Sequence, residues 1–206
     1  MRNRHTKLLS SFAASVAVLA LPAMASAQIK SPGAHPDYSV ELEPHFVLDW
    51  ARHYGYGNDE AIGVGLRATI PFLDNGPISS INNNMGIGFG LDWTHNGDAC
   101  DNFFWRGSRY GFECSVDNFH FPVVVQWNFW LTPIISVFGE AGLDIVHTRW
   151  EWDNCGAPGF ECDGSDTDVN FAFWGGGRFL FGEGSSVGGI VRLGWPYISL
   201  GIGILL

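Results

Sequence analysis

This 206-residue chain contains ten charged or ionisable residues that lie in segments where apolar residues alternate with residues of other types. They carry both signs and include two histidines: Glu43, His45, Asp49, Arg67, Asp92, His120, Glu140, Asp144, Arg178 and Arg192. If they faced one another, each arginine would pair with more than one carboxylate, because a guanidinium carries five donors in a planar fork. Two interpretations stay open: a buried ion network that fills an interior and fixes strand register, or a gated polar path or ligand site.

The residue pattern does not indicate an enzyme. The chain contains no His-x-Ser motif and no serine that the sequence places beside a histidine and an acid. A cluster of serine, histidine and acid assembled from distant segments would revive a lipid-modifying activity, because such groups act through geometry rather than sequence spacing. We expect no cofactor.

The stretch DGSDTD offers carboxylates at Asp163, Asp166 and Asp168, at a spacing similar to that of calcium ligands. It does not match the EF-hand pattern, whose ligand positions and central glycine are defined. A solvated acidic loop is therefore favoured over a calcium site.

The first 27 residues have the features of a secretory signal peptide, with a membrane anchor as the alternative. Arg2, Arg4 and Lys7 precede an apolar run over residues 8–20, and Ala25-Ser26-Ala27 is a small-x-small cleavage site. Without the three basic residues, eight remain against 21 acidic ones, and the formal charge changes from −10 to −13. This charge excludes a basic nucleic-acid-binding surface.

Four cysteines in an exported chain predict disulfides. Cys100 and Cys114 bracket one irregular stretch, and Cys155 and Cys162 bracket another. Three pairings are possible. We favour the local one, Cys100 with Cys114 and Cys155 with Cys162, because each bridge would staple one loop. A zinc site is the alternative, although six residues between Cys155 and Cys162 are a wide spacing for a structural zinc pair.

Apolar residues recur with a period of two in eight segments, and this period predicts β-strands. In residues 61–72, for example, Ile62, Val64 and Leu66 share one face while Gly63 and Gly65 lie on the other. The segments are residues 40–50, 61–72, 85–94, 119–130, 135–147, 169–181, 186–195 and 197–206. An even number of strands, with short turns at one end and long loops over residues 51–60, 95–118 and 148–168, is the plan of an outer-membrane barrel.

The apolar face is expected to point outward, toward lipid, although a soluble eight-stranded barrel with an apolar interior shows the same alternation. The other face is rich in glycine, which suits a crowded interior. Aromatic residues fall into two groups at the strand ends, as in the girdles of membrane proteins. Trp50, Trp93, Phe119 and Trp195 form the group at the loop end, and Phe72, Phe129, Phe179 and Phe181 form the group at the turn end.

The last segment, YISLGIGILL, alternates to the C-terminus and must close the barrel on the first strand, because no open sheet edge persists in lipid. It resembles the closing-strand signal of bacterial outer-membrane barrels, although that family usually ends in phenylalanine and this chain ends in Leu206. The chain as a whole resembles small eight-stranded barrels of the OmpA, OmpX and OmpW type. The resemblance implies an all-β, antiparallel, up-and-down transmembrane barrel over residues 40–206, after a signal peptide (1–27) and a periplasmic segment (28–39).

The resemblance also implies location in the cell outer membrane, contact with its lipid and lipopolysaccharide, and insertion by the barrel assembly machinery. The leading functional hypothesis is a structural or surface-interaction protein with a plugged lumen and disulfide-stapled extracellular loops. A narrow channel for small or apolar solutes is the second hypothesis, and a lipid-modifying barrel enzyme is the third.

Overall fold

The computed structural model describes residues 28–49, 60–97, 104–105, 108–109, 114–152 and 163–206. The predicted signal peptide (1–27), the girdle residue Trp50 and three of the four cysteines, Cys100, Cys155 and Cys162, lie outside the described residues. In this described part of the chain, no helix is long and apolar enough to cross a membrane.

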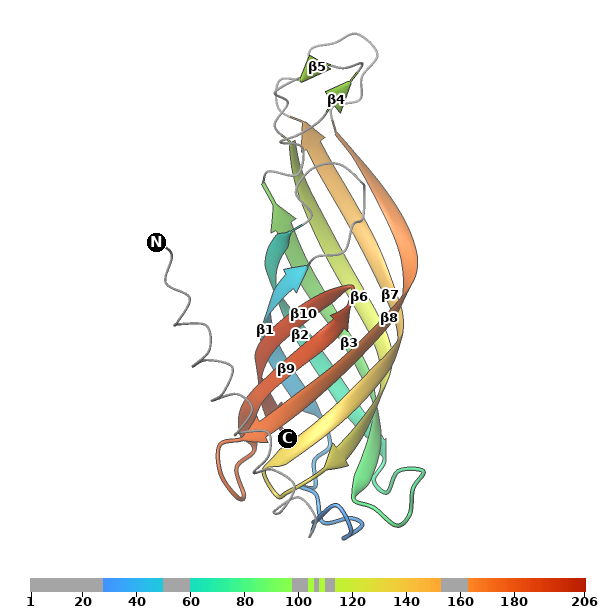
Figure 1. The fold of residues 1–206 in the computed structure, drawn as a ribbon, viewed down its shortest axis with the longest axis vertical. Coiled ribbons are helices and arrows are strands. Elements are labelled where there is room, and N and C mark those ends of the chain that lie inside the picture. Colours follow the sequence, from blue (N-terminus) through green and yellow to red (C-terminus); the bar gives the residue numbers. More distant parts are fainter. Residues whose placement is uncertain (1–27, 50–59, 98–103, 106–107, 110–113, 153–162) are drawn as a thin grey trace, which may run out of the picture.

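Eight antiparallel strands close a barrel in the order β1-β10-β9-β8-β7-β6-β3-β2, which confirms the predicted fold class (Figure 1). The first strand pairs with the last, from Glu41 opposite Leu205 to Asp49 opposite Tyr197. A separate two-stranded sheet joins β4 (Phe104–Trp105) and β5 (Ser108–Arg109). The barrel strands are β1 (Glu41–Asp49), β2 (Ala61–Leu73), β3 (Asn83–Asn96), β6 (Cys114–Trp130), β7 (Ile135–Trp152), β8 (Asp163–Leu180), β9 (Val187–Trp195) and β10 (Tyr197–Leu205).

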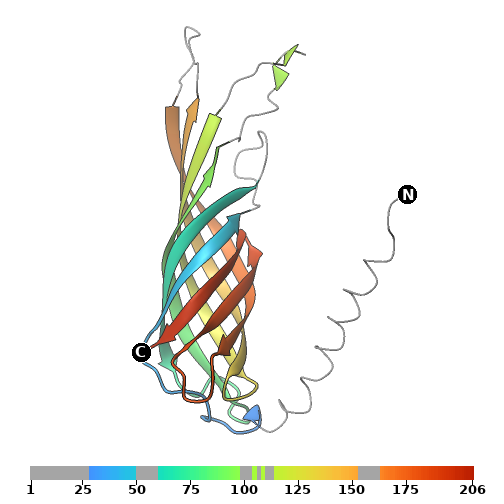
Figure 2. The same cartoon turned by 90° about the vertical axis from the view of Figure 1, so that its left-hand side faces the viewer.

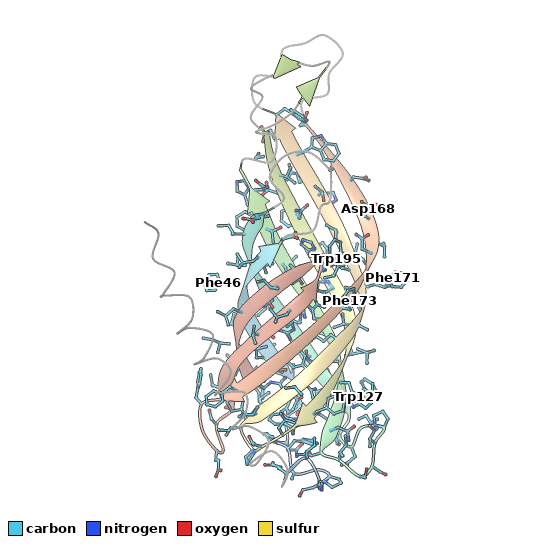
Figure 3. The ribbon with its side chains drawn as sticks, viewed as in Figure 1. Phe46, Trp127, Asp168, Phe171, Phe173 and Trp195 are labelled. Atoms are coloured by element: carbon cyan, nitrogen blue, oxygen red, sulfur yellow. The ribbon has the colours of Figure 1, made fainter. Side chains whose placement is uncertain are left out.

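The apolar face of the strands points outward, and the charged face points into the barrel. Phe171 is 81% exposed and Phe46 is 71% exposed, whereas Arg192 and Asp92 are fully buried. Figure 3 shows Phe46, Phe171, Phe173 and Trp195 projecting from the outer surface at a similar height. A soluble barrel would bury its apolar face, so this arrangement excludes that alternative and defines a surface for lipid.

Strands β6, β7 and β8 are longer than their apolar pattern predicts. Pairing continues to Cys114 opposite Trp152 and to Glu151 opposite Asp163, so parts of the expected loops 95–118 and 148–168 are strand. In these strand extensions the outward-facing residues are polar. A search for alternating apolar residues therefore does not detect them. We call residues 114–118, 148–152 and 163–168 the raised wall, which stands above the ends of β9 and β10 (Figures 1 and 2).

The segment before β1 folds against the turn end of the barrel. Tyr38 packs in a buried cluster with Trp130, Leu180 and Leu205, and its hydroxyl accepts a 3.1 Å hydrogen bond from Asn84. Burial raises the pKa of the Tyr38 hydroxyl above its ordinary value, so this group stays protonated. The segment therefore covers the end of the lumen opposite the raised wall.

Inward-facing glycines allow close contact between neighbouring strands. A Cβ atom at Gly142 of β7 would collide with the carbonyl oxygen of Val123 on β6, which is fixed by the sheet. Gly139 of the same strand faces outward, and a Cβ atom there would meet no atom within 4 Å. The two glycines lie on the same strand, but only Gly139 has room for a side chain.

We predict that Gly142→Ala lowers the free energy of unfolding by roughly 1–3 kcal/mol, because overpacking forces the backbone of β6 or β7 to move. The measurement is urea unfolding of the refolded protein, followed by its mobility on unboiled gels. Gly139→Ala is the matched control and should stay within about 0.5 kcal/mol of the wild type. Equal effects of the two substitutions would show that the close approach at Gly142 is unimportant.

Candidate functional site

The turn-end part of the lumen is built on Arg178. Its Nε donates to Oε1 of Glu41 at 2.6 Å, its Nη2 pairs with Oε2 of the same carboxylate, and its Nη1 donates to Ser136 Oγ at 2.9 Å. The guanidinium also lies 5.4 Å from the centre of the Trp130 ring. Glu41 is absent from the predicted charge set, although its position two residues before Glu43 puts it on the same face of β1.

Arg192 and Arg67 hold the middle of the lumen together through Glu140. The Nε of Arg192 donates to both carboxylate oxygens of Glu140, at 3.1 and 3.0 Å, and its Nη1 pairs with Glu43. Arg67 donates to Glu140 at 2.8 Å, and Gln126 donates to it at 2.7 Å. We call Glu41, Glu43, Arg67, Glu140, Arg178 and Arg192 the Arg/Glu layer, in which three guanidiniums face three carboxylates.

The half of the lumen nearer the raised wall uses histidine in place of arginine. His45 Nε2 lies 2.9 Å from Asp92 Oδ1, and the Tyr197 hydroxyl donates to Asp92 Oδ2. His120 Nδ1 lies 2.7 Å from Asp144 Oδ2. We call His45, Asp49, Asp92, His120, Asp144 and Tyr197 the His/Asp layer, and none of them is more than 5% exposed.

Uncharged side chains complete the filling between and above these layers. Thr148 Oγ1 donates to Asn118 Oδ1 at 2.7 Å, and Asn118 Nδ2 donates to Thr94 Oγ1 at 3.5 Å; all three residues are buried. The ring centres of Trp174 and Tyr197 are 5.1 Å apart, and the Arg67 guanidinium carbon lies 4.8 Å from the centre of the Trp174 ring. The structure therefore brings the predicted charge set together with polar and aromatic partners.

The described members of the aromatic girdles face outward or lie half-buried at the surface. Trp93, Trp195, Phe72, Phe179 and Phe181 are exposed, and Phe119 and Phe129 are intermediate. The predicted girdles omitted Phe46, Phe171 and Phe173, which are among the most exposed outward aromatics, and Trp127, which Figure 3 shows nearer the turn end. The same period-two face already contained these four residues.

The three acids of the calcium candidate lie on strand β8 and not in a loop. Alternation places Asp163 on the outward face and Asp166 and Asp168 on the inward face, and all three are exposed. In the described ranges, no group of three or more His, Cys, Asp or Glu residues is arranged to hold a metal ion. Cys114 begins β6, and its disulfide with Cys100 stays a prediction because Cys100 lies outside the described residues.

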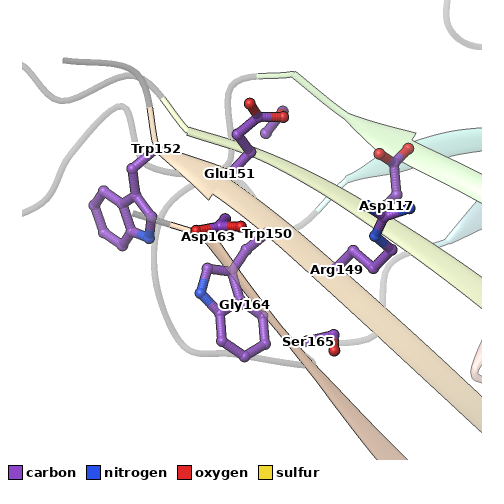
Figure 4. Close-up of a pocket in the computed structure, with 9 residues that line it drawn as sticks. Asp117, Arg149, Trp150, Glu151, Trp152, Asp163, Gly164 and Ser165 are labelled. Carbon is purple, nitrogen blue, oxygen red and sulfur yellow. The ribbon is translucent and has the colours of Figure 1, made fainter. Parts of the chain in front are cut away.

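A polar cleft of about 510 Å³ lies on the raised wall (Figure 4). Cross-strand pairing aligns Asp117 with Arg149 and Ser165, and Ser115 with Glu151 and Asp163. Asp117 Oδ1 accepts a 2.9 Å hydrogen bond from the Trp93 indole and lies 2.9 Å from His95 Nδ1. The cleft is lined by Ser115, Asp117, Arg149, Trp150, Glu151, Trp152, Asp163, Gly164 and Ser165.

An exposed apolar surface around a buried, charged interior defines an eight-stranded transmembrane β-barrel. The chain is similar in fold to Ail, the attachment invasion locus protein of Yersinia pestis, with 14% sequence identity, a TM-score of 0.52, and coverage of 83% of this chain and 100% of Ail. A second structure of Ail, in complex with the heparin analogue sucrose octasulfate, gives the same identity, coverage and TM-score. No protein-family model and no curated protein sequence matches the chain. The likeness confirms the expected resemblance to small outer-membrane barrels at the level of fold.

We predict that Arg192→Gln lowers the free energy of unfolding by about 3–5 kcal/mol, because it leaves Glu43 and Glu140 buried without their shared cation. Urea unfolding of the protein refolded in lipid or detergent measures this loss. Adding Glu43→Gln to the variant should restore part of the stability, since one uncompensated charge is removed.

Arg149→Gln is the control for Arg192→Gln, because Arg149 is exposed on the raised wall. We expect it to change the free energy of unfolding by no more than about 0.5 kcal/mol. If Arg192→Gln were equally mild, the Arg/Glu layer would not stabilise the barrel.

Proposed function

We propose that this chain is an outer-membrane surface protein whose lumen is closed and whose raised wall makes its external contacts. One observation supports the closed lumen above all: charged pairs connect strands that are not neighbours in the barrel. Arg67 on β2 bonds Glu140 on β7, and Arg178 on β8 bonds Glu41 on β1. Because such pairs cross the interior at several levels, they occupy the space that a solute would need.

The outward apolar surface and the pairing of the C-terminal strand with β1 support insertion in a bilayer. We propose export through a cleaved signal peptide, insertion by the barrel assembly machinery, and contact with outer-membrane lipid and lipopolysaccharide. The segment of residues 28–39 then lies in the periplasm and the raised wall outside the cell. Disulfides within the extracellular loops are part of the same proposal. We assign no catalytic role to the described residues.

The raised wall supports a surface-interaction role because it is a paired sheet that extends beyond the apolar band. Among the charged side chains of its described residues, five are acidic and one is basic, so the partner we expect is not a polyanion. This expectation distinguishes the chain from Ail, which has been crystallised with a heparin analogue. The acidic residues of the wall are Asp117, Glu151, Asp163, Asp166 and Asp168, against Arg149.

The closed lumen predicts no conductance. We expect the refolded mature protein to give no discrete current steps in a planar bilayer, while its folded state is verified by unboiled gel mobility. The variant Arg67→Ala with Trp174→Ala removes two large buried side chains from the lumen and should produce small, reproducible steps. Steps from the wild type that change with Arg67→Ala would instead favour the narrow channel for small or apolar solutes.

The acidic wall predicts weak binding to sulfated sugars. At about 0.15 M salt, where charges interact over roughly 8 Å, the folded protein should pass through a heparin column without retention. A variant with Asp163→Lys, Asp166→Lys and Asp168→Lys should be retained, because it reverses the charge of one strand of the wall. Retention of the wild type would contradict the proposed exclusion of polyanions.

A further inference from the structure

The two layers of the lumen neutralise their carboxylates with different cations. The Arg/Glu layer uses guanidiniums, which stay protonated in proteins at all ordinary pH values. The aspartates of the His/Asp layer lie against imidazoles instead, with Asp92 beside His45 and Asp144 beside His120. Imidazole is the one side chain whose charge ordinarily changes near neutral pH. A rise in pH therefore removes positive charge from the His/Asp layer and not from the Arg/Glu layer.

His120 of β6 lies between carboxylates from two other strands. Its Nδ1 is 2.7 Å from Oδ2 of Asp144 on β7, and its Nε2 is 3.3 Å from Oδ2 of Asp49 on β1. A neutral imidazole has one N–H and a lone pair on the other nitrogen, so one carboxylate would face a lone pair. The imidazolium presents an N–H to both carboxylates. The position of His120 thus fits the protonated ring.

Asp92 of β3 is a neighbour of both histidines. It lies 2.9 Å from Nε2 of His45 on β1, and it is the cross-strand neighbour of His120. Among the described residues, the guanidinium near it belongs to Arg67 of β2, whose Nη2 is 3.9 Å away and donates a closer, 2.9 Å hydrogen bond to Tyr197 of β10. Arg67 therefore compensates Asp92 only in part and is bonded elsewhere.

In the part of the chain that the structure describes, the other groups beside the two imidazoles are a paired carboxylate and neutral aromatic rings. Glu43, 3.8 Å from His45 Nδ1, is paired with Arg192 of β9. The Tyr197 ring of β10 lies edge-on to His120 at 5.3 Å between centres, and β8 contributes the neutral Trp174, whose indole donates to the Tyr197 carbonyl at 2.8 Å. Without the imidazolium proton of His120, Asp49 and Asp144 would lose the cation that lies between them.

We propose that the His/Asp layer is a proton-dependent latch that holds the half of the lumen nearer the raised wall. Protonated His120 ties β1, β6 and β7 together through Asp49 and Asp144. When it loses its proton, the two carboxylates repel in a low-dielectric interior, and entry of water relieves the repulsion. The Arg/Glu layer keeps its charges, so the turn end stays closed. The inference rests on the proposed closed lumen, but its tests do not depend on conductance.

The first test is the protonation state of His120 in the folded mature protein in detergent micelles. Nitrogen-15 spectra distinguish an imidazolium from a neutral ring, and loss of a signal in His120→Gln assigns it. We expect His120 to be an imidazolium at about pH 7.5, where an exposed histidine is mostly neutral. His147, on the outward face of β7, is the internal reference. A neutral His120 ring at this pH would overturn the latch.

The second test is thermal stability as a function of pH. The stabilisation is present while His120 is protonated and is lost as the pH rises. We therefore expect the unfolding midpoint of the wild type to fall by about 10 °C between about pH 7 and about pH 10. Asp49→Asn should flatten this dependence, because a neutral His120 then faces one carboxylate and an amide.

His147→Gln is the matched control and should keep the wild-type pH profile. His120→Gln should be less stable than the wild type at neutral pH and insensitive to further increases. If that variant does not fold, the Asp49→Asn profile and the spectra of the wild type still decide. A profile of Asp49→Asn identical to that of the wild type would refute the latch, whatever the result of the conductance measurement.

Discussion

The buried carboxylate of Glu140 accepts hydrogen bonds from Arg192, Arg67 and Gln126, and the order of the lumen depends on this convergence. These donors come from β9, β2 and β6, so one acid on β7 fixes the relative positions of four strands. A carboxylate buried without partners would cost several kcal/mol. The side chains around Glu140 must therefore be hydrogen-bond donors or well-packed neutral groups. These side chains fill the lumen.

The same constraint explains why the chain uses two kinds of cation. Arginine bridges carboxylates on opposite walls because its fork reaches several acceptors at once. Near the raised wall, His120 instead lies directly between two aspartates that approach from both sides. The planar imidazole ring fits between these two carboxylates, and the Tyr197 ring packs edge-on beside it. The substitution of imidazole for guanidinium keeps the packing but makes the charge of this layer depend on protons.

Much of the barrel was predictable from the sequence because alternation is a local property. Residues 61–72 were expected as a strand and lie in β2 (Ala61–Leu73), and the inward position of Arg67 followed from the period alone. The partners of Arg67 were not predictable, since Glu140 and Tyr197 lie on β7 and β10 and the contacts depend on side-chain reach across the lumen. The length of β7 was also missed, because beyond Ile145 its outward residues are polar and the apolar signal ends where the lipid-facing surface ends.

The acidic run of β8 has a structural explanation that does not need a metal ion. Pairing of β8 with β9 ends where Phe173 faces Trp195, and above this level the only described strand beside β8 is β7. Such an edge offers backbone donors and acceptors to any passing chain, and charged side chains are one way in which proteins prevent this pairing. Asp163, Asp166 and Asp168 lie along this edge with side chains on both faces. Because moving ionised carboxylates from water into lipid is costly, these residues keep the edge in water, where an unpaired strand is tolerated, and clear of the lipid, where it is not.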